Sequence, residues 1–141
     1  PEELIGGFPK TREELFAYKG LILGSVEAAA FTPDQLRMLA DFVGKRGGGL
    51  LMLGGRRAFS EGGWAGTPLA EVLPVELETK AANAAEFYSP LLVKPTRAGN
   101  TYPVTQLAAT ERDSAVKWES MPEVSTVNPI ARVKPGATVL L

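Results

Sequence analysis

Two short apolar runs bounded by glycine, with one well-marked helix between them, constrain the fold of this chain more than any other feature. The runs span residues 20–24 and 50–53, and the helix begins at Thr32. A brief apolar run of this kind is typical of a strand buried in a parallel sheet. Parallel strands are joined by a crossover, usually a helix, and the crossover is right-handed. Residues 20–53 therefore predict a βαβ unit.

The helix of this unit carries signals at both ends. Thr32 stands at the N-cap, Pro33 at the first helical position, and Gln35 completes a capping box. An apolar stripe with helical spacing follows, made of Leu36, Leu39, Ala40 and Val43. The three glycines at 47–49 are expected to end the helix.

Further elements are predicted on both sides of this unit. Thr11 and Glu14 form a capping box, so a short helix is expected to begin there. Later segments predict a short helix begun by 67–68, an alternating strand at 75–78, a strand at 86–94, a short helix at 110–117, and strands at 130–134 and 137–141. Seven of the eleven prolines follow residue 73, so the second half is expected to be an irregular, partly antiparallel appendage on the same sheet.

Length and charge fit one soluble α/β domain. The chain has 141 residues, 45% of them hydrophobic, and 16 acidic residues against 15 basic ones. No basic stripe interleaved with aromatic residues is present, so nucleic acid is not an expected partner. No apolar run reaches the ~20 residues of a membrane span, so this segment is not expected to insert into a bilayer. The chain starts without Met and stops in an apolar run, which we interpret as a piece of a longer protein.

The absence of cysteine and histidine limits the chemistry of this chain. Disulfides, zinc–thiolate sites, cysteine nucleophiles and the commonest general base are all excluded from residues 1–141. Ser25 and Ser60 remain as nucleophiles, but neither lies in a Ser-x-x-Lys or Gly-x-Ser-x-Gly motif. The acidic residues form no calcium-binding pattern. We therefore assign no catalytic residue, metal or cofactor, although a missing group can lie outside this piece.

The loop after the second apolar run is the candidate ligand-binding segment. Five of the thirteen residues at 54–66 are glycine, and open α/β sheets bind ligands at the carboxyl ends of their strands. The candidate binding residues are Gly54, Gly55, Arg56, Arg57, Glu61, Trp64 and Thr67.

Two interpretations of this loop stay open. In the functional one, one of Arg56 and Arg57 points inward and holds a carboxylate or phosphate, while Trp64 stacks on a ring and the helix begun by Thr67 adds a positive dipole. In the structural one, an arginine pairs with Glu61 or Asp41, and Phe59 and Trp64 plug the end of the sheet. Tyr88 and Tyr102 either pack over the loop or are half-buried strand residues, and Trp118 is expected in the core.

Several strings resemble the class I glutamine amidotransferase-like superfamily. They are YKGLILG at 18–24, TPDQL at 32–36, GGGLLMLGG at 47–55, GGRRAFSEGGWAGTP at 54–68, WESMP at 118–122, NP at 128–129 and KPGA at 134–137. The resemblance covers roughly residues 8–141. It implies a flavodoxin-like three-layer sandwich with a mostly parallel sheet, whose first strand and helix lie upstream of residue 1. In that family such domains often belong to larger bacterial membrane-associated proteins with von Willebrand A-type domains.

Departures from the family decide the expected chemistry. An active site of that family has a cysteine thiolate at a sharp turn after the strand, which we call the elbow, and a histidine with a glutamate downstream. Here the elbow falls at Gly54 or Gly55, and Tyr102 stands where we would look for the histidine.

We therefore expect a non-catalytic binding or scaffold module, whose partners are other domains of the same longer chain. One alternative is a hydrolase acting on a sugar or amide, using the 54–67 loop with residues outside this fragment. Self-association through apolar strands with exposed edges is a further alternative.

Overall fold

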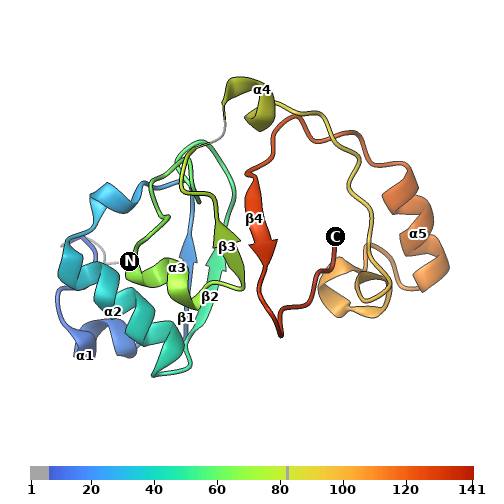
Figure 1. Ribbon diagram of the computed structural model, residues 1–141. Coiled ribbons are helices and arrows are strands. Elements are labelled where there is room, and N and C mark those ends of the chain that lie inside the picture. Colours follow the sequence, from blue (N-terminus) through green and yellow to red (C-terminus); the bar gives the residue numbers. More distant parts are fainter. Residues whose placement is uncertain (1–6, 82) are drawn as a thin grey trace.

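The computed structural model describes residues 7–81 and 83–141 and shows a mixed α/β architecture (Figure 1). The predicted βαβ unit is confirmed. Strand β1 (Gly20–Leu23) pairs in parallel with β2 (Gly49–Met52), with Gly20 opposite Gly49 and Leu23 opposite Met52. Helix α2 (Pro33–Gly44) makes the crossover between them. Residues 54–67, which follow β2, therefore leave the carboxyl end of a parallel strand as expected.

The predicted capping boxes of both helices are confirmed. Thr32 Oγ1 accepts a hydrogen bond from the Gln35 amide at 3.2 Å, and Gln35 Oε1 accepts one from the Thr32 amide at 2.9 Å. The same reciprocal pair joins Thr11 and Glu14 at the start of α1 (Arg12–Phe16). Helix α2 ends earlier than expected, at Gly44.

Gly48, which was expected only to help end the helix, also has a packing role. A Cβ built on Gly48 would lie 2.2 Å from the ring of Phe42, which is fully buried. The return from α2 to β2 therefore passes under this ring where only glycine leaves space.

The core lies on one side of the parallel strands. Its larger cluster consists of Leu23, Ala28, Leu39, Trp64 and Leu69. Leu21, Leu50 and Met52 pack against this cluster from the strands. A smaller cluster joins α1 to α2 and consists of Leu15, Met38 and Phe42.

The opposite face of the strands is open, which corrects the expectation of fully buried strands. Ile22 is 69% exposed and Leu51 52% exposed. Alternate residues of a strand point to opposite faces, so a sheet covered on one side buries only every second side chain. Among the described residues, helices cover only the face that carries Leu21 and Leu23.

A second, separate sheet forms in the other half of the chain. After α3 (Pro68–Val72), strand β3 (Val75–Leu77) pairs antiparallel with β4 (Ile130–Val133). The antiparallel pairing was expected, but its placement on the same sheet as β1 and β2 was wrong, because β3 and β4 pair with each other and with neither of those strands.

Two predicted strands of the second half are replaced by other structure. Helix α4 (Ala84–Phe87) occupies the start of the expected strand at 86–94, where only an isolated bridge joins Leu91 to Val124. The segment 137–141 forms no strand, since its carbonyl groups accept hydrogen bonds from the Thr96 amide and hydroxyl. The predicted helix near 110–117 is confirmed as α5 (Glu111–Glu119), with Thr110 as its N-cap.

Short 3₁₀ helices complete the described chain, at Ala28–Ala30, Gly99–Thr101 and Pro103–Thr105. None of the helices within residues 7–81 and 83–141 combines the length and apolar character needed to cross a membrane.

Candidate functional site

The elbow after β2 is closed by a side chain from the far end of the chain. The Gly55 amide donates a hydrogen bond to Asn128 Oδ1 at 2.7 Å, and Asn128 Nδ2 donates to the Gly55 carbonyl oxygen at 3.0 Å. Asn128 thus binds the backbone of this glycine as a neighbouring strand would. A Cβ on Gly54 would lie 2.8 Å from Asn128 Oδ1.

Gly55 is enclosed from the other side by Ser25, which follows β1. A Cβ on Gly55 would lie 2.7 Å from Ser25 Oγ and 3.0 Å from its Cβ, and φ of Gly55 is +141°, in the region that favours glycine. Ser25 Oγ also accepts a hydrogen bond from the Arg57 amide at 3.1 Å. Ser25 therefore organises the turn, and a side chain at Gly54 or Gly55 would have to displace Asn128 or Ser25.

Backbone hydrogen bonds hold the rest of the loop in a defined conformation. The Gly62 amide donates to the Ala58 carbonyl oxygen at 2.9 Å, and the Gly62 carbonyl oxygen accepts from the Ala28 amide at 2.8 Å. A Cβ on Gly62 would lie 2.1 Å from the Arg57 carbonyl oxygen. Glycine is needed here because the chain folds back directly onto itself.

Two of the predicted binding residues, Trp64 and Thr67, hold the fold together. Trp64 is fully buried, its indole Nε1–H donates to the Val26 carbonyl oxygen at 2.9 Å, and its ring contacts Phe31. Trp64 therefore offers no stacking surface to a ligand and belongs to the core, in one cluster with Leu23 and Leu69. Thr67 is the N-cap of α3, where its hydroxyl oxygen accepts from the Ala70 amide. Helix α3 has only five residues.

The two arginines of the loop are both exposed and make different contacts. Arg57 Nε lies 3.5 Å from Glu27 Oε1, and both side chains are more than half exposed. The Arg56 guanidinium lies 5.6 Å from the ring centre of Tyr88, so this tyrosine does pack against the loop. The structure therefore does not place either arginine in an enclosed anion site.

The two acids proposed as arginine partners both have polar contacts. Glu61 accepts a hydrogen bond from Asn128 Nδ2 at 2.5 Å. Asp41 forms ion pairs with Arg12 and Lys45. The hydrogen bond from Lys45, helped by the charges of Arg12 and Lys45, lowers the pKa of Asp41 below its ordinary value, against a smaller opposing effect of desolvation.

Asn128 is the residue of this site that sequence reasoning missed. It joins Gly55 and Glu61, two predicted residues, across 73 and 67 positions of sequence. An Asn followed by Pro indicates a turn, but this signal does not reveal which distant backbone its amide will reach.

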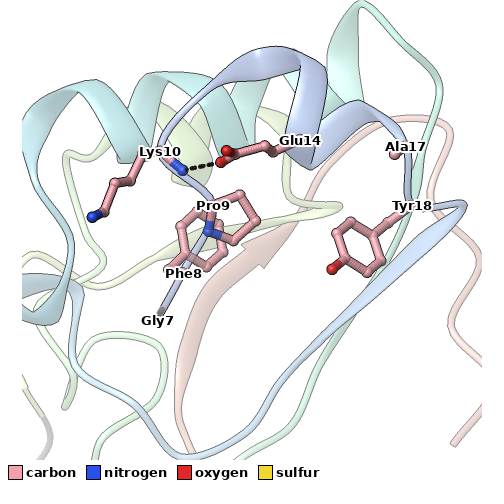
Figure 2. A pocket seen from close by; sticks show the side chains of 7 residues that line it. All are labelled: Gly7, Phe8, Pro9, Lys10, Glu14, Ala17 and Tyr18. Carbon is pink, nitrogen blue, oxygen red and sulfur yellow. Dashed lines mark hydrogen bonds between the residues drawn. The ribbon is translucent and has the colours of Figure 1, made fainter. Parts of the chain in front are cut away.

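Two hollows of the surface bear on this site. One of about 550 Å³ lies beside α1 and is lined by Gly7, Phe8, Pro9, Lys10, Glu14, Ala17 and Tyr18 (Figure 2). The Glu14 carboxylate in this lining is already hydrogen-bonded within the protein. It accepts from the Lys10 amide at 2.8 Å and caps α1.

A second hollow of about 600 Å³ adjoins the 54–67 loop and includes Ser60 and Glu61 in its lining. Across residues 7–81 and 83–141, no three acidic side chains are grouped closely enough to hold a metal ion. The loop thus combines a backbone fixed by Asn128 with one neighbouring polar hollow.

Comparisons with known proteins gave no match. No model of a known family, no curated protein and no solved structure matches this chain. The geometry therefore carries the functional argument.

Proposed function

We propose that this chain is a non-catalytic, glutamine amidotransferase-like module that acts as a binding or scaffold part of a larger bacterial protein. The observation that carries the proposal is the closed elbow. At the position where an active relative would present a thiolate, Gly55 is enclosed by Ser25 and bonded to Asn128. A nucleophile must reach its substrate from this turn, and here the turn is filled from both sides.

The state of the loop favours binding or scaffolding over the hydrolase alternative. Trp64 belongs to the core, Glu61 bonds Asn128, and Arg57 pairs with Glu27. These residues are used to hold the loop, and a hydrolase would need them to face a substrate.

The open face of the parallel strands supports a place within a larger assembly. Parallel sheets occur almost entirely with both faces covered, whereas Ile22 and Leu51 are more than half exposed. We propose that other domains of the same longer chain cover this face and complete a flavodoxin-like three-layer sandwich, with β1 and β2 as part of its parallel sheet.

A glutaminase assay tests the proposal. The purified chain, and the longer protein that contains it, are incubated with glutamine, and ammonia release is measured. We expect no turnover above the uncatalysed rate. Turnover by the chain refutes the non-catalytic assignment, and turnover of a sugar or amide by the longer protein that is lost in Arg56→Ala or Glu61→Ala establishes the hydrolase alternative.

The variant Gly55→Cys tests the reason given for inactivity. We expect it to be destabilised by about 1–3 kcal/mol, because a side chain there meets Ser25 on a backbone that favours glycine. Ser25→Gly combined with Gly55→Cys is the matched variant, and it should recover part of the loss. A stable single variant that hydrolyses glutamine would show that only the thiol was missing.

A further inference from the structure

One short segment carries contacts that fasten the second half of the chain to the first. It comprises residues 128–134, which include β4, and we call it the strap (Figure 1). At one end of the strap, Asn128 exchanges two hydrogen bonds with the backbone of Gly55. At the other end, Lys134 Nζ donates to two carbonyl oxygens of α3, both at 2.8 Å. Between these ends, β4 pairs with β3.

The strap contributes no buried side chain to the fold. None of residues 128–134 is buried, and all four residues of β4 are exposed. Hydrogen bonds hold the strap, together with the ion pair of Arg132 and Glu76, whose side chains are 71% and 38% exposed. Each contact of this kind adds little net stability, because water can replace it. A segment with few buried apolar contacts opens at a lower free energy than the core.

The loop beneath the strap has its own support. Ala58 and Trp64 are fully buried, and the Gly62 amide donates to the Ala58 carbonyl oxygen at 2.9 Å. The Trp64 indole is hydrogen-bonded to the segment after β1, where Ser25 also lies. None of these contacts involves the strap, so its release would leave the loop in place.

We propose that the strap is a reversible latch, which lifts from the first half as one unit while the βαβ unit and the loop stay folded. In the open state, Asn128 leaves the Gly55 amide, the Gly55 carbonyl oxygen and the Glu61 carboxylate. These groups are one donor and two acceptors that a partner can reach only after release. This inference goes beyond the proposed function, because it concerns access to the loop and does not depend on turnover.

Four backbone amides of the unaltered chain report on this movement. The Gly55 amide, which binds Asn128, and the Lys134 amide, which donates to the Pro74 carbonyl oxygen at 2.9 Å, report on release of the strap. The Leu53 amide, which donates to β1 at 2.9 Å, and the Gly62 amide report on the parts that stay folded.

Hydrogen exchange measured by NMR under native conditions tests the proposal. We expect Gly55 and Lys134 to share one protection factor, at least about tenfold below those of Leu53 and Gly62. Equal protection of all four amides overturns the proposal, because the strap would then open only in global unfolding. Clearly different protection of Gly55 and Lys134 also overturns it, because the strap would then not move as one unit.

An engineered disulfide tests the same movement by preventing it. The chain has no cysteine, so Glu76→Cys combined with Arg132→Cys places a single pair at facing positions of β3 and β4. In the oxidised form, we expect Gly55 and Lys134 to reach the protection of Leu53 to within about threefold. The reduced form of the same variant is the control and should keep the gap. A gap that persists after oxidation overturns the latch.

An ion-pair variant tests the latch without a cross-link. Arg132→Ala should lower the protection of Gly55 and Lys134 together, by roughly two- to fivefold, and leave Leu53 unchanged. Arg37→Ala is the matched control, since it removes a similarly exposed ion pair from α2, and it should leave the strap amides unchanged. A fall at Lys134 without one at Gly55 overturns the proposal.

Discussion

The two halves of this chain are held by different kinds of contact. Every buried hydrophobic side chain of the described residues lies between Leu15 and Leu73, except Phe87. In the second half, Val104 is 75% exposed and Val116 59% exposed. Figure 1 shows the same division, with α1, α2 and α3 gathered beside β1 and β2, and α5 on the far side of β4.

Polar contacts take the place of a core in the second half. The Trp118 indole donates to the Thr105 carbonyl oxygen at 2.9 Å, and the Leu107 amide donates to Ser114 Oγ at 2.9 Å. A typical hydrogen bond adds only about 1 kcal/mol net, whereas burying a large apolar side chain adds about 1.5–3 kcal/mol. The first half therefore has a hydrophobic core of its own, while the second half depends on specific hydrogen bonds and on its attachment to the first.

Truncation of matched apolar side chains tests this division most strongly. Leu39→Ala should lower the free energy of unfolding by about 2–5 kcal/mol, because Leu39 is fully buried. Val116→Ala, on the exposed face of α5, should change it by no more than about 0.5 kcal/mol. Urea unfolding followed by circular dichroism measures both. Similar losses in the two variants would show that α5 has a core of its own.

The next effect comes from the space reserved under the Phe42 ring. Gly48→Ala places a methyl group 2.2 Å from this ring and should cost about 1–3 kcal/mol. Gly24→Ala is the matched control, since a Cβ there meets nothing within 4 Å, and it should be nearly neutral. Thermal unfolding of both variants provides the measurement, and a neutral Gly48→Ala would mean that the ring moves aside easily.

A third test breaks the link between the halves. Asn128→Ala removes the partner of Gly55 and should cost about 1–3 kcal/mol, because the part-buried Gly55 amide is left without its acceptor. Asn100→Ala, an exposed asparagine of the same half, should stay within about 0.5 kcal/mol of the unaltered chain. Hydrogen exchange distinguishes the consequences: we expect faster exchange at the elbow and slow exchange retained in α2. Unchanged exchange at Gly55 would contradict the closed-elbow description.

The smallest effect is expected from pH. Asp41 has a lowered pKa through its hydrogen bond with Lys45, and Glu76 has one through its hydrogen bond with Arg132. A carboxyl group with a lowered folded-state pKa contributes stability above its unfolded pKa, about 4, and loses it as the pH falls through the folded-state value. The Lys45 and Arg132 side chains are mostly exposed, so the loss should be small and further reduced by salt.

Variants assign this acid sensitivity to one half or the other. Asp41→Asn should remove the contribution of the first half and so flatten the dependence of the melting temperature on pH below about 4. Glu76→Gln should remove the contribution of the β3–β4 pair and flatten the same dependence. Melting curves at several acidic pH values measure this. An unaltered slope in both variants would place the acid sensitivity elsewhere.

Local signals account for the parts of the fold that were predicted correctly. The capping boxes at Thr11 and Thr32 involve groups three residues apart, so their geometry is written into the sequence. The pairing of β3 with β4 joins segments more than fifty residues apart and is set by tertiary packing. For this reason the separation into two sheets was not predictable from the sequence, although the antiparallel character was expected.

The candidate site shows the same limit. Its place after a parallel strand followed from the βαβ pattern. The burial of Trp64 depends on which surfaces surround it, namely Phe31 and the Val26 carbonyl, and residue type alone does not decide this. The closure of the elbow depends on Asn128, whose partner lies 73 residues away.

The closed elbow also bears on how readily mutation could place a nucleophile at this turn. Some glycine codons are a single base from a cysteine codon, so a thiol at position 55 is easy to reach by mutation. Ser25 already occupies the space that such a side chain would take, since a Cβ at position 55 would lie 2.7 Å from its Oγ. A thiol at this turn therefore needs coordinated changes on two separate segments, and intermediate sequences would bear the loss of stability before gaining any activity. Selection that preserves folding alone would thus keep the module in its present form.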